Sequence, residues 1–198
     1  MKITTFASSM LLLCSSASVM AHFMLVYPPS RGFDDDAEPN APCGGFNTVQ
    51  TNRSMFPLTD GFVDINSFHP SSTVTINVAI GSNPNTSDFT AAAASSIAIN
   101  HPGHACLPFN LTSIPGAANN TNATIQLVYS GGDGSLYQCA DVVLVTSAPG
   151  FDKTQCINDN GSNTTTSTSG ANSRVSSVGV SGVMASVLGV VVATLAMV

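Results

Sequence analysis

The chain has 198 residues, of which 11 are acidic and 5 are basic, and its formal net charge at pH 7 is −6. All the acidic residues lie between positions 22 and 160, where the only basic residues are Arg31, Arg53 and Lys153. This acidic body excludes nucleic acid as a partner, because phosphate backbones demand a basic surface, and it favours the attraction of cations.

Residues 1–21 have the layout of a secretory signal peptide. A basic start is followed by an apolar run at 6–13, which is too short to span a bilayer, and then by Val19 and Ala21 before the expected cleavage site. Cleavage after Ala21 would give His22 a free α-amine, and this amine and the ring could then chelate one metal ion together. The alternative is that cleavage exposes a histidine by chance.

The body, residues 22–160, is long enough for one domain with a real core. Alternating apolar runs predict strands at 73–80, 96–100, 124–130 and 137–145. The GGDG sequence at 131–134 predicts a hairpin turn, and the alanine run at 91–94 predicts either one helical turn or a bulged strand. Short strands separated by turn signals favour an all-β, antiparallel β-sandwich with few short helical turns.

Histidines occur at the predicted rim of this sandwich. Pro70 holds the chain extended after His69, so the His69 imidazole is expected to project just before a strand. Together with the amine and ring of His22 it would form a three-nitrogen set that suits Cu(II), which prefers tetragonal nitrogen ligation. The alternative for His69 is an exposed loop histidine. His101 and His104 flank a Pro-Gly turn and are interpreted as loop residues.

Two acidic features are candidates for binding a cation. Asp141 shares a predicted strand face with Cys139 and Val143, where alternation predicts burial, and a buried carboxylate needs a cation, a metal ion or several donors. The alternative is an edge position that faces water, and Asp133 is a second candidate. The acidic run at 34–38 is interpreted as a solvated loop that could collect cations weakly.

Cysteines and sequons both indicate the secretory route. Cys14 would leave with the signal peptide, so four cysteines remain and predict two disulfides. Three pairings are open. The pairing of Cys43 with Cys156 and of Cys106 with Cys139 is preferred, because the first bond would tie the N-terminal loop to the end of the domain. Sequons predict glycans on surface loops at Asn52, Asn85, Asn110, Asn119, Asn122, Asn160 and Asn163.

The C-terminal part reads as a Ser/Thr-rich stalk, 161–175, followed by a removed anchor signal, 176–198. Small residues at Ser169 and Gly170, a polar spacer and an apolar end are typical of glycosylphosphatidylinositol attachment. The final apolar run at 183–198 is shorter than the roughly 20 residues of a spanning helix, and no basic flank follows it. A single-pass anchor is the alternative. The expected location is the extracellular face of the plasma membrane or the cell wall.

In combination these features resemble the fungal copper-binding proteins related to lytic polysaccharide monooxygenases, including the copper acquisition factors. The resemblance covers the mature domain and rests on the Ala-His cleavage site, FMLVYPPSRG at 23–32, PCGGF at 42–46, FHP at 68–70, CAD at 139–141 and the anchor-bearing tail. It implies an immunoglobulin-like sandwich that binds one copper ion through a histidine brace. The implied ligands are His22 through its amine and ring, His69 through its ring and Asp141 through its carboxylate.

The same resemblance implies copper acquisition or homeostasis rather than catalysis. A carboxylate beside the copper would favour Cu(II) over Cu(I), and a membrane copper transporter is a candidate partner. The chain has no tryptophan and three tyrosines, so few aromatic side chains could stack on sugars. Two alternatives remain open. One is a copper monooxygenase that acts on an unusual wall glycan, and the other is a metal-free structural wall protein.

Overall fold

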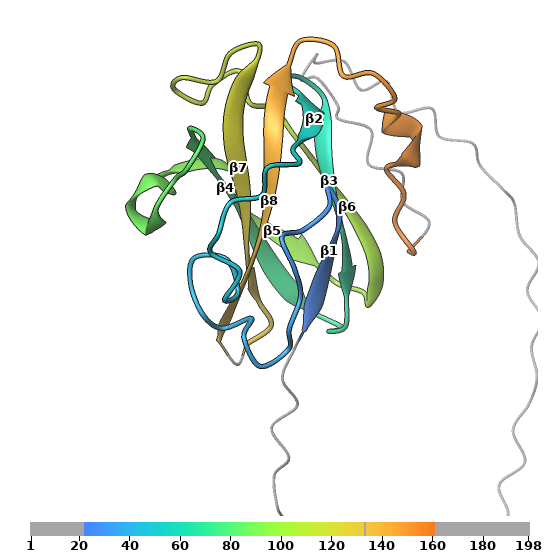
Figure 1. The fold of residues 1–198 in the computed structure, drawn as a ribbon. Coiled ribbons are helices and arrows are strands. Elements are labelled where there is room, and N and C mark those ends of the chain that lie inside the picture. The colour runs from blue at the N-terminus through green and yellow to red at the C-terminus, as the bar shows by residue number, and fades with distance from the viewer. Residues whose placement is uncertain (1–21, 133, 161–198) are drawn as a thin grey trace, which may run out of the picture. The chain divides into compact units, whose positions relative to one another are not determined.

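The computed structural model describes residues 22–132 and 134–160, which form two β-sheets packed face to face (Figure 1). The strands are β1 Phe23–Tyr27, β2 Ser54–Pro57, β3 Gly61–Ser67, β4 Ser72–Ile80, β5 Ala91–Ile99, β6 Gly103–Phe109, β7 Thr121–Ser130 and β8 Ser135–Val145, and the short 3₁₀ turns are η1 Thr86–Asp88 and η2 Lys153–Gln155. The smaller sheet has the order β1-β3-β6 and the larger β2-β8-β7-β4-β5. Among the described strands, only the β2–β8 pair is parallel. The predicted all-β sandwich is confirmed.

The strands predicted from alternation are β4, β5, β7 and β8 of the larger sheet. In β4, Val74, Ile76 and Val78 are buried, as their period of two requires. The alanine run at 91–94 belongs to β5 and pairs with β4 through register shifts, so the bulged-strand alternative is correct. The smaller sheet was not predicted, because β1 is a five-residue apolar run without alternation and polar residues interrupt β3 and β6.

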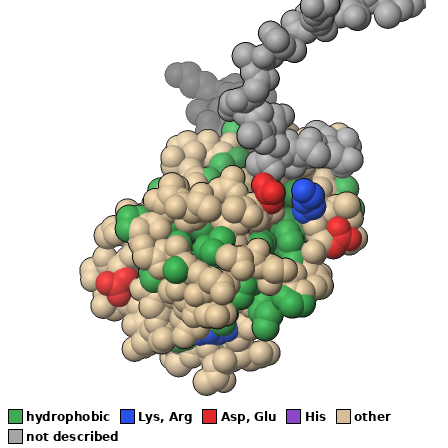
Figure 2. All heavy atoms as spheres, turned by 90° about the horizontal axis from the view of Figure 1, so that it is seen from above, with side chains coloured by type: hydrophobic (Ala, Val, Ile, Leu, Met, Phe, Trp, Pro, Cys, Tyr) green, Lys and Arg blue, Asp and Glu red, His purple; other side chains and the backbone are tan. Residues whose placement is uncertain are grey.

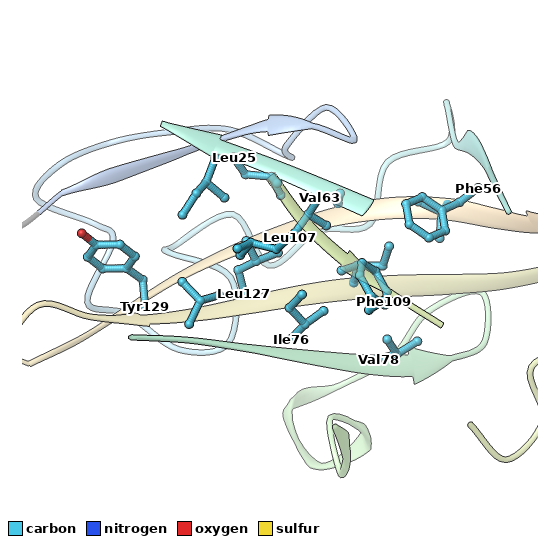
Figure 3. Packing of buried hydrophobic residues seen from close by; sticks show 14 of the residues in the cluster. Leu25, Phe56, Val63, Ile76, Val78, Leu107, Phe109, Leu127 and Tyr129 are labelled. Atoms are coloured by element: carbon cyan, nitrogen blue, oxygen red, sulfur yellow. The ribbon is translucent and has the colours of Figure 1, made fainter. Parts of the chain in front are cut away.

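The apolar core lies between the two sheets (Figure 3). Val63 and Leu107 of the smaller sheet face Ile76 and Leu127 of the larger one, and each such buried side chain contributes roughly 1.5–3 kcal/mol. At one end of this core the Tyr129 ring is fully buried. The core therefore extends up to the residues that begin β1.

Phe23 fixes the start of β1 in that core. Its side chain is fully buried and stacks on the Tyr129 ring, with 4.8 Å between ring centroids. The Tyr129 hydroxyl is hydrogen-bonded to Ser67 Oγ at 2.8 Å, so its burial leaves no unpaired polar atom. Because Phe23 directly follows His22, this packing also fixes where His22 lies.

The connection between β1 and β2 runs along β8 (Figure 1). The Arg31 amide donates to the Cys139 carbonyl, and the Tyr137 amide donates to the Glu38 carbonyl. Gly44 has φ +61°, and a Cβ there would collide with the Tyr137 carbonyl oxygen, so the PCGGF segment needs glycine at this point. The connection therefore covers the outer face and free edge of β8.

The four cysteines form two disulfides, as predicted, but the preferred pairing of these cysteines is wrong. The bonds are Cys43–Cys139 and Cys106–Cys156. Cys106 alternates with the core residues Ala105 and Leu107, so it lies on the outer face of the smaller sheet. Cys139 lies on the outer face of the larger sheet, under the β1–β2 connection, so the two sheets separate these cysteines.

Within residues 22–132 and 134–160, no helix has the length and apolar character needed to cross a membrane. The expected signal peptide, stalk and anchor signal lie outside the described residues, as do Asp133, Asn163, Ser169 and Gly170. The sequon residues Asn52, Asn85, Asn110, Asn119 and Asn160 are exposed, and Asn122 is half-buried in β7. Glycosylation of these residues stays a prediction.

Candidate metal centre

Backbone pairing places His22 at the rim of the smaller sheet. Phe23 pairs with Ser67 across β1 and β3, and the Phe68 amide donates to the His22 carbonyl at 3.1 Å. His22 therefore lies opposite the segment that carries His69. This end of β1 is at the bottom of Figure 1, and the opposite end, shown in Figure 2, displays scattered charges and no visible histidine among the described residues.

His69 lies in the turn between β3 and β4, half-buried, as expected for a rim residue. Its Nδ1 is 2.7 Å from the Ser71 carbonyl oxygen, whereas the Ser71 amide is farther from it, at 3.3 Å. A carbonyl oxygen only accepts, so Nδ1 carries the proton and Nε2 has the free lone pair. Metal-binding histidines commonly donate their second ring N–H to a carbonyl in this way.

Two carboxylates meet the His22 ring. Glu38 Oε2 is 2.8 Å and Asp35 Oδ1 is 3.7 Å from His22 Nδ1. One ligand atom from each of these three residues lies within 4.8 Å of the others, and no second group of this kind occurs in the part of the chain that the structure describes. The ring of His69 is not a member of this group. A nitrogen and two carboxylate oxygens thus converge at the start of β1.

Glu38 and Asp35 differ in their surroundings. The Glu38 side chain is 1% exposed and that of Asp35 is 61% exposed. Burial raises the pKa of Glu38, and the hydrogen bonds with His22 and Gln138 oppose that rise. The interpretation of residues 34–38 as a solvated loop is therefore wrong for Glu38. The signal that could have revealed it is the following PCGGF segment, whose disulfide holds this loop against β8.

Asp141 is buried, as its alternation predicts, but its partners are not those of a metal centre. Arg31 donates to both carboxylate oxygens at 2.8 Å. Further hydrogen bonds come from the Thr124 hydroxyl at 2.7 Å and from the backbone N–H of Gln50 at 2.8 Å. Burial by itself would raise the pKa of Asp141, but the bonds from Arg31, Gln50 and Thr124 and the Arg31 charge hold it below its usual range. The cation that Asp141 needs is Arg31.

The pleat of β8 explains why Asp141 and His22 do not meet. Successive side chains of a strand point to opposite faces. Gln138 points toward β1 and Glu38, whereas Asp141 is on the other face, beneath Arg31. The structure therefore brings Glu38 and Asp35, and not Asp141, next to the His22 ring.

The other two histidines have separate environments. His101 Nδ1 is 3.0 Å from the Pro102 carbonyl oxygen, in a loop as expected. His104 belongs to β6, so its interpretation as a loop residue is wrong. Its Nδ1 lies 3.0 Å from Asp64 Oδ2, and its amide donates to Asp159 at 2.7 Å.

Comparison with known proteins shows the family. A family model described as copper acquisition factor BIM1-like matches residues 20–161. The chain belongs to this family. The match includes every described residue, so the sandwich and its rim are the family's domain, and the resemblance seen in the sequence is confirmed.

Similar proteins come from several fungi. Copper acquisition factor BIM1 of Cryptococcus neoformans var. grubii is 41% identical over 153 residues, which cover 73% of this chain and 69% of that protein. BIM1 of Cryptococcus neoformans var. neoformans is 40% identical over 151 residues, covering 71% and 68%. Lytic polysaccharide monooxygenase-like protein ham-7 of Neurospora crassa is 30% identical over 177 residues, covering 77% and 75%.

Proposed function

We propose that this copper acquisition factor, once residues 1–21 are removed, binds one Cu(II) ion outside the cell and does not cleave polysaccharide. The proposed ligands are the amine and Nδ1 of His22, Nε2 of His69 and a carboxylate from Glu38 or Asp35. The observation that carries the proposal is the convergence of His22 Nδ1 with both carboxylates at a strand start that is fixed in the core.

The donor set fits copper in its higher oxidation state. Imidazole and amine nitrogens suit Cu(II), whereas Cu(I) is favoured by soft thiolate and thioether ligands. The four cysteines of the described domain are all in disulfides and supply no thiolate. The α-amine of His22 must lose its proton before it can bind copper, so the affinity should increase with pH.

Replacing His69 tests the second imidazole of the proposed centre. With a native N-terminus at His22, His69→Ala should weaken Cu(II) binding at least ~100-fold, because even outer-shell partners of a metal contribute about 10–100-fold. The affinity is measured by competition with a chelator of known strength. His101→Ala is the matched control and should bind as wild type, since His101 Nδ1 contacts the Pro102 carbonyl oxygen and His101 is not in the group around His22.

Three outcomes would contradict the proposal. Equal binding by both variants would remove His69 as a ligand. A wild-type protein that binds no copper would favour the metal-free structural role. Oxidised oligosaccharides released from wall glycans in the presence of ascorbate would favour a monooxygenase, which the names of some relatives make worth testing.

We also propose that the chain is held at the cell surface by a glycosylphosphatidylinositol anchor at Ser169 or Gly170. Treatment of intact cells with a phospholipase specific for that anchor should release the protein, and deletion of residues 178–198 should send it to the medium. Immunoblots of the cell and medium fractions measure both effects. Retention on cells after both treatments would favour a single-pass membrane anchor.

A further inference from the structure

Gln138 is a buried amide at the centre of the contacts behind His22. Its side chain, on β8, is 1% exposed. Its Nε2 donates to the Phe23 carbonyl and to Glu38 Oε1, both at 2.6 Å, and its Oε1 accepts from the Leu25 amide at 2.9 Å. A primary amide has two N–H donors and one carbonyl oxygen, so each of its polar groups is used.

These three bonds join the start of β1, which follows His22, to the loop that carries Glu38, and both segments contribute to the proposed copper site. Two of them hold the edge of β1 that does not pair with β3, at the residue directly after His22 and at Leu25. The third holds one oxygen of Glu38 and leaves the other, Oε2, at 2.8 Å from His22 Nδ1. We propose that Gln138 is the positioning residue of this centre, an inference that rests on the proposed function and deepens it.

The chemistry of a buried carboxylate explains why such a residue is needed. A charged oxygen removed from water requires hydrogen-bond donors, and Glu38 has two, the amide of Gln138 and the ring of His22. Copper on His22 Nδ1 would remove the second donor, so Gln138 would then be the remaining side-chain donor to Glu38. Without Gln138, Glu38 would turn toward water and the carboxylate would leave the centre.

The neighbouring strand offers a matched control. Gln126 on β7 is also a buried amide, 5% exposed. Its Oε1 accepts from Asn77 Nδ2 and its Nε2 donates to the Pro42 carbonyl, each at 2.8 Å. It pairs with Cys139 across the sheet, and its hydrogen bonds go to neither Glu38 nor β1. Replacing it should disturb packing to a similar degree without touching the centre.

The first experiment compares Gln138→Met with Gln126→Met, both with a native N-terminus. Gln138→Met should weaken Cu(II) binding about 10–100-fold, the range typical of outer-shell partners, and should change the electron paramagnetic resonance spectrum of bound Cu(II). Gln126→Met should lose stability but keep the wild-type affinity and spectrum. A Gln138→Met protein with wild-type affinity and spectrum, or equal changes in both variants, would overturn the proposal.

The second experiment starts with the metal-free protein. Hydrogen exchange of the Leu25 amide should accelerate in Gln138→Met, because its acceptor is gone, and should stay slow in Gln138→Glu, which keeps an acceptor oxygen but loses the amide donors to Glu38 and Phe23. After copper is added, the spectrum of bound Cu(II) should differ from wild type in both variants. If the wild type binds no copper, the proposed function fails, and Leu25 exchange still decides whether Gln138 holds β1 in place: unchanged exchange in Gln138→Met would overturn that part of the inference.

Discussion

A protein with even one extra residue before His22 should bind Cu(II) at least ~100-fold more weakly than a protein that begins at His22. Losing an outer-shell partner of a metal typically weakens binding about 10–100-fold, and losing a direct ligand should weaken it more. The extension converts the basic α-amine into an amide nitrogen, which is a poor ligand. Weak binding should persist, since His22 Nδ1 still lies beside Glu38 and Asp35.

The measurement is a chelator competition on two preparations whose N-termini have been verified by mass spectrometry. A protein extended by one residue at its C-terminal end is the control, and it should behave as wild type. Equal tight binding by the N-terminally extended and the native protein would remove the amine from the ligand set. The fold should be unaffected in either case, because Phe23 and not His22 packs in the core.

Asp141→Asn should destabilise the protein by about 3–5 kcal/mol at pH 7, the cost of breaking a buried ion pair and leaving one charge uncompensated. The Arg31 and Asp141 side chains are 2% and 0% exposed. Urea denaturation measures the effect. Asp60→Asn, at an exposed turn residue, is the control and should change the free energy of unfolding little.

The pH dependence of this loss has a defined sign. The pKa of Asp141 is lowered in the folded protein, so the ionised carboxylate stabilises the fold above its unfolded pKa of about 3.9, and this stabilisation disappears as the pH falls through the folded value. The gap between wild type and Asp141→Asn should therefore be full at neutral pH and shrink below about pH 4. A gap that is constant from pH 7 to pH 2 would contradict the ion pair.

The same variant separates two assignments of the copper carboxylate. Asp141→Asn should leave the Cu(II) spectrum unchanged as long as it folds, because Asp141 lies beneath Arg31 on the far face of β8. Glu38→Gln should change the spectrum. The reverse result would restore Asp141 as the ligand and remove Glu38.

Local patterns predicted part of the fold and part of the site. The alternation around Val74 and Ile76 predicted β4, and the alternation around Asp141 predicted its burial. The Pro after His69 predicted a rim position. Each of these depends on side-chain direction within a few residues, which sequence spacing reports directly.

The remaining features depend on contacts between distant segments. Asp141 and Arg31 are 110 positions apart, and Gln138 and Glu38 are 100 apart. Spacing along the chain does not say which loop covers which face of a strand, so neither partner could be derived. The disulfide pairing failed for the same reason, because it depends on which sheet carries each outward-facing cysteine.

Because Phe23 packs in the core, the fold should not depend on the position at which the expected signal peptide is cleaved. A cut one residue early or one residue late would leave Phe23 stacked on Tyr129 and the sandwich intact. If the proposed centre is correct, a sample with mixed N-termini would be uniformly folded but would bind copper tightly only on the chains that begin at His22, so a shortfall in tight binding would measure the accuracy of cleavage rather than the affinity.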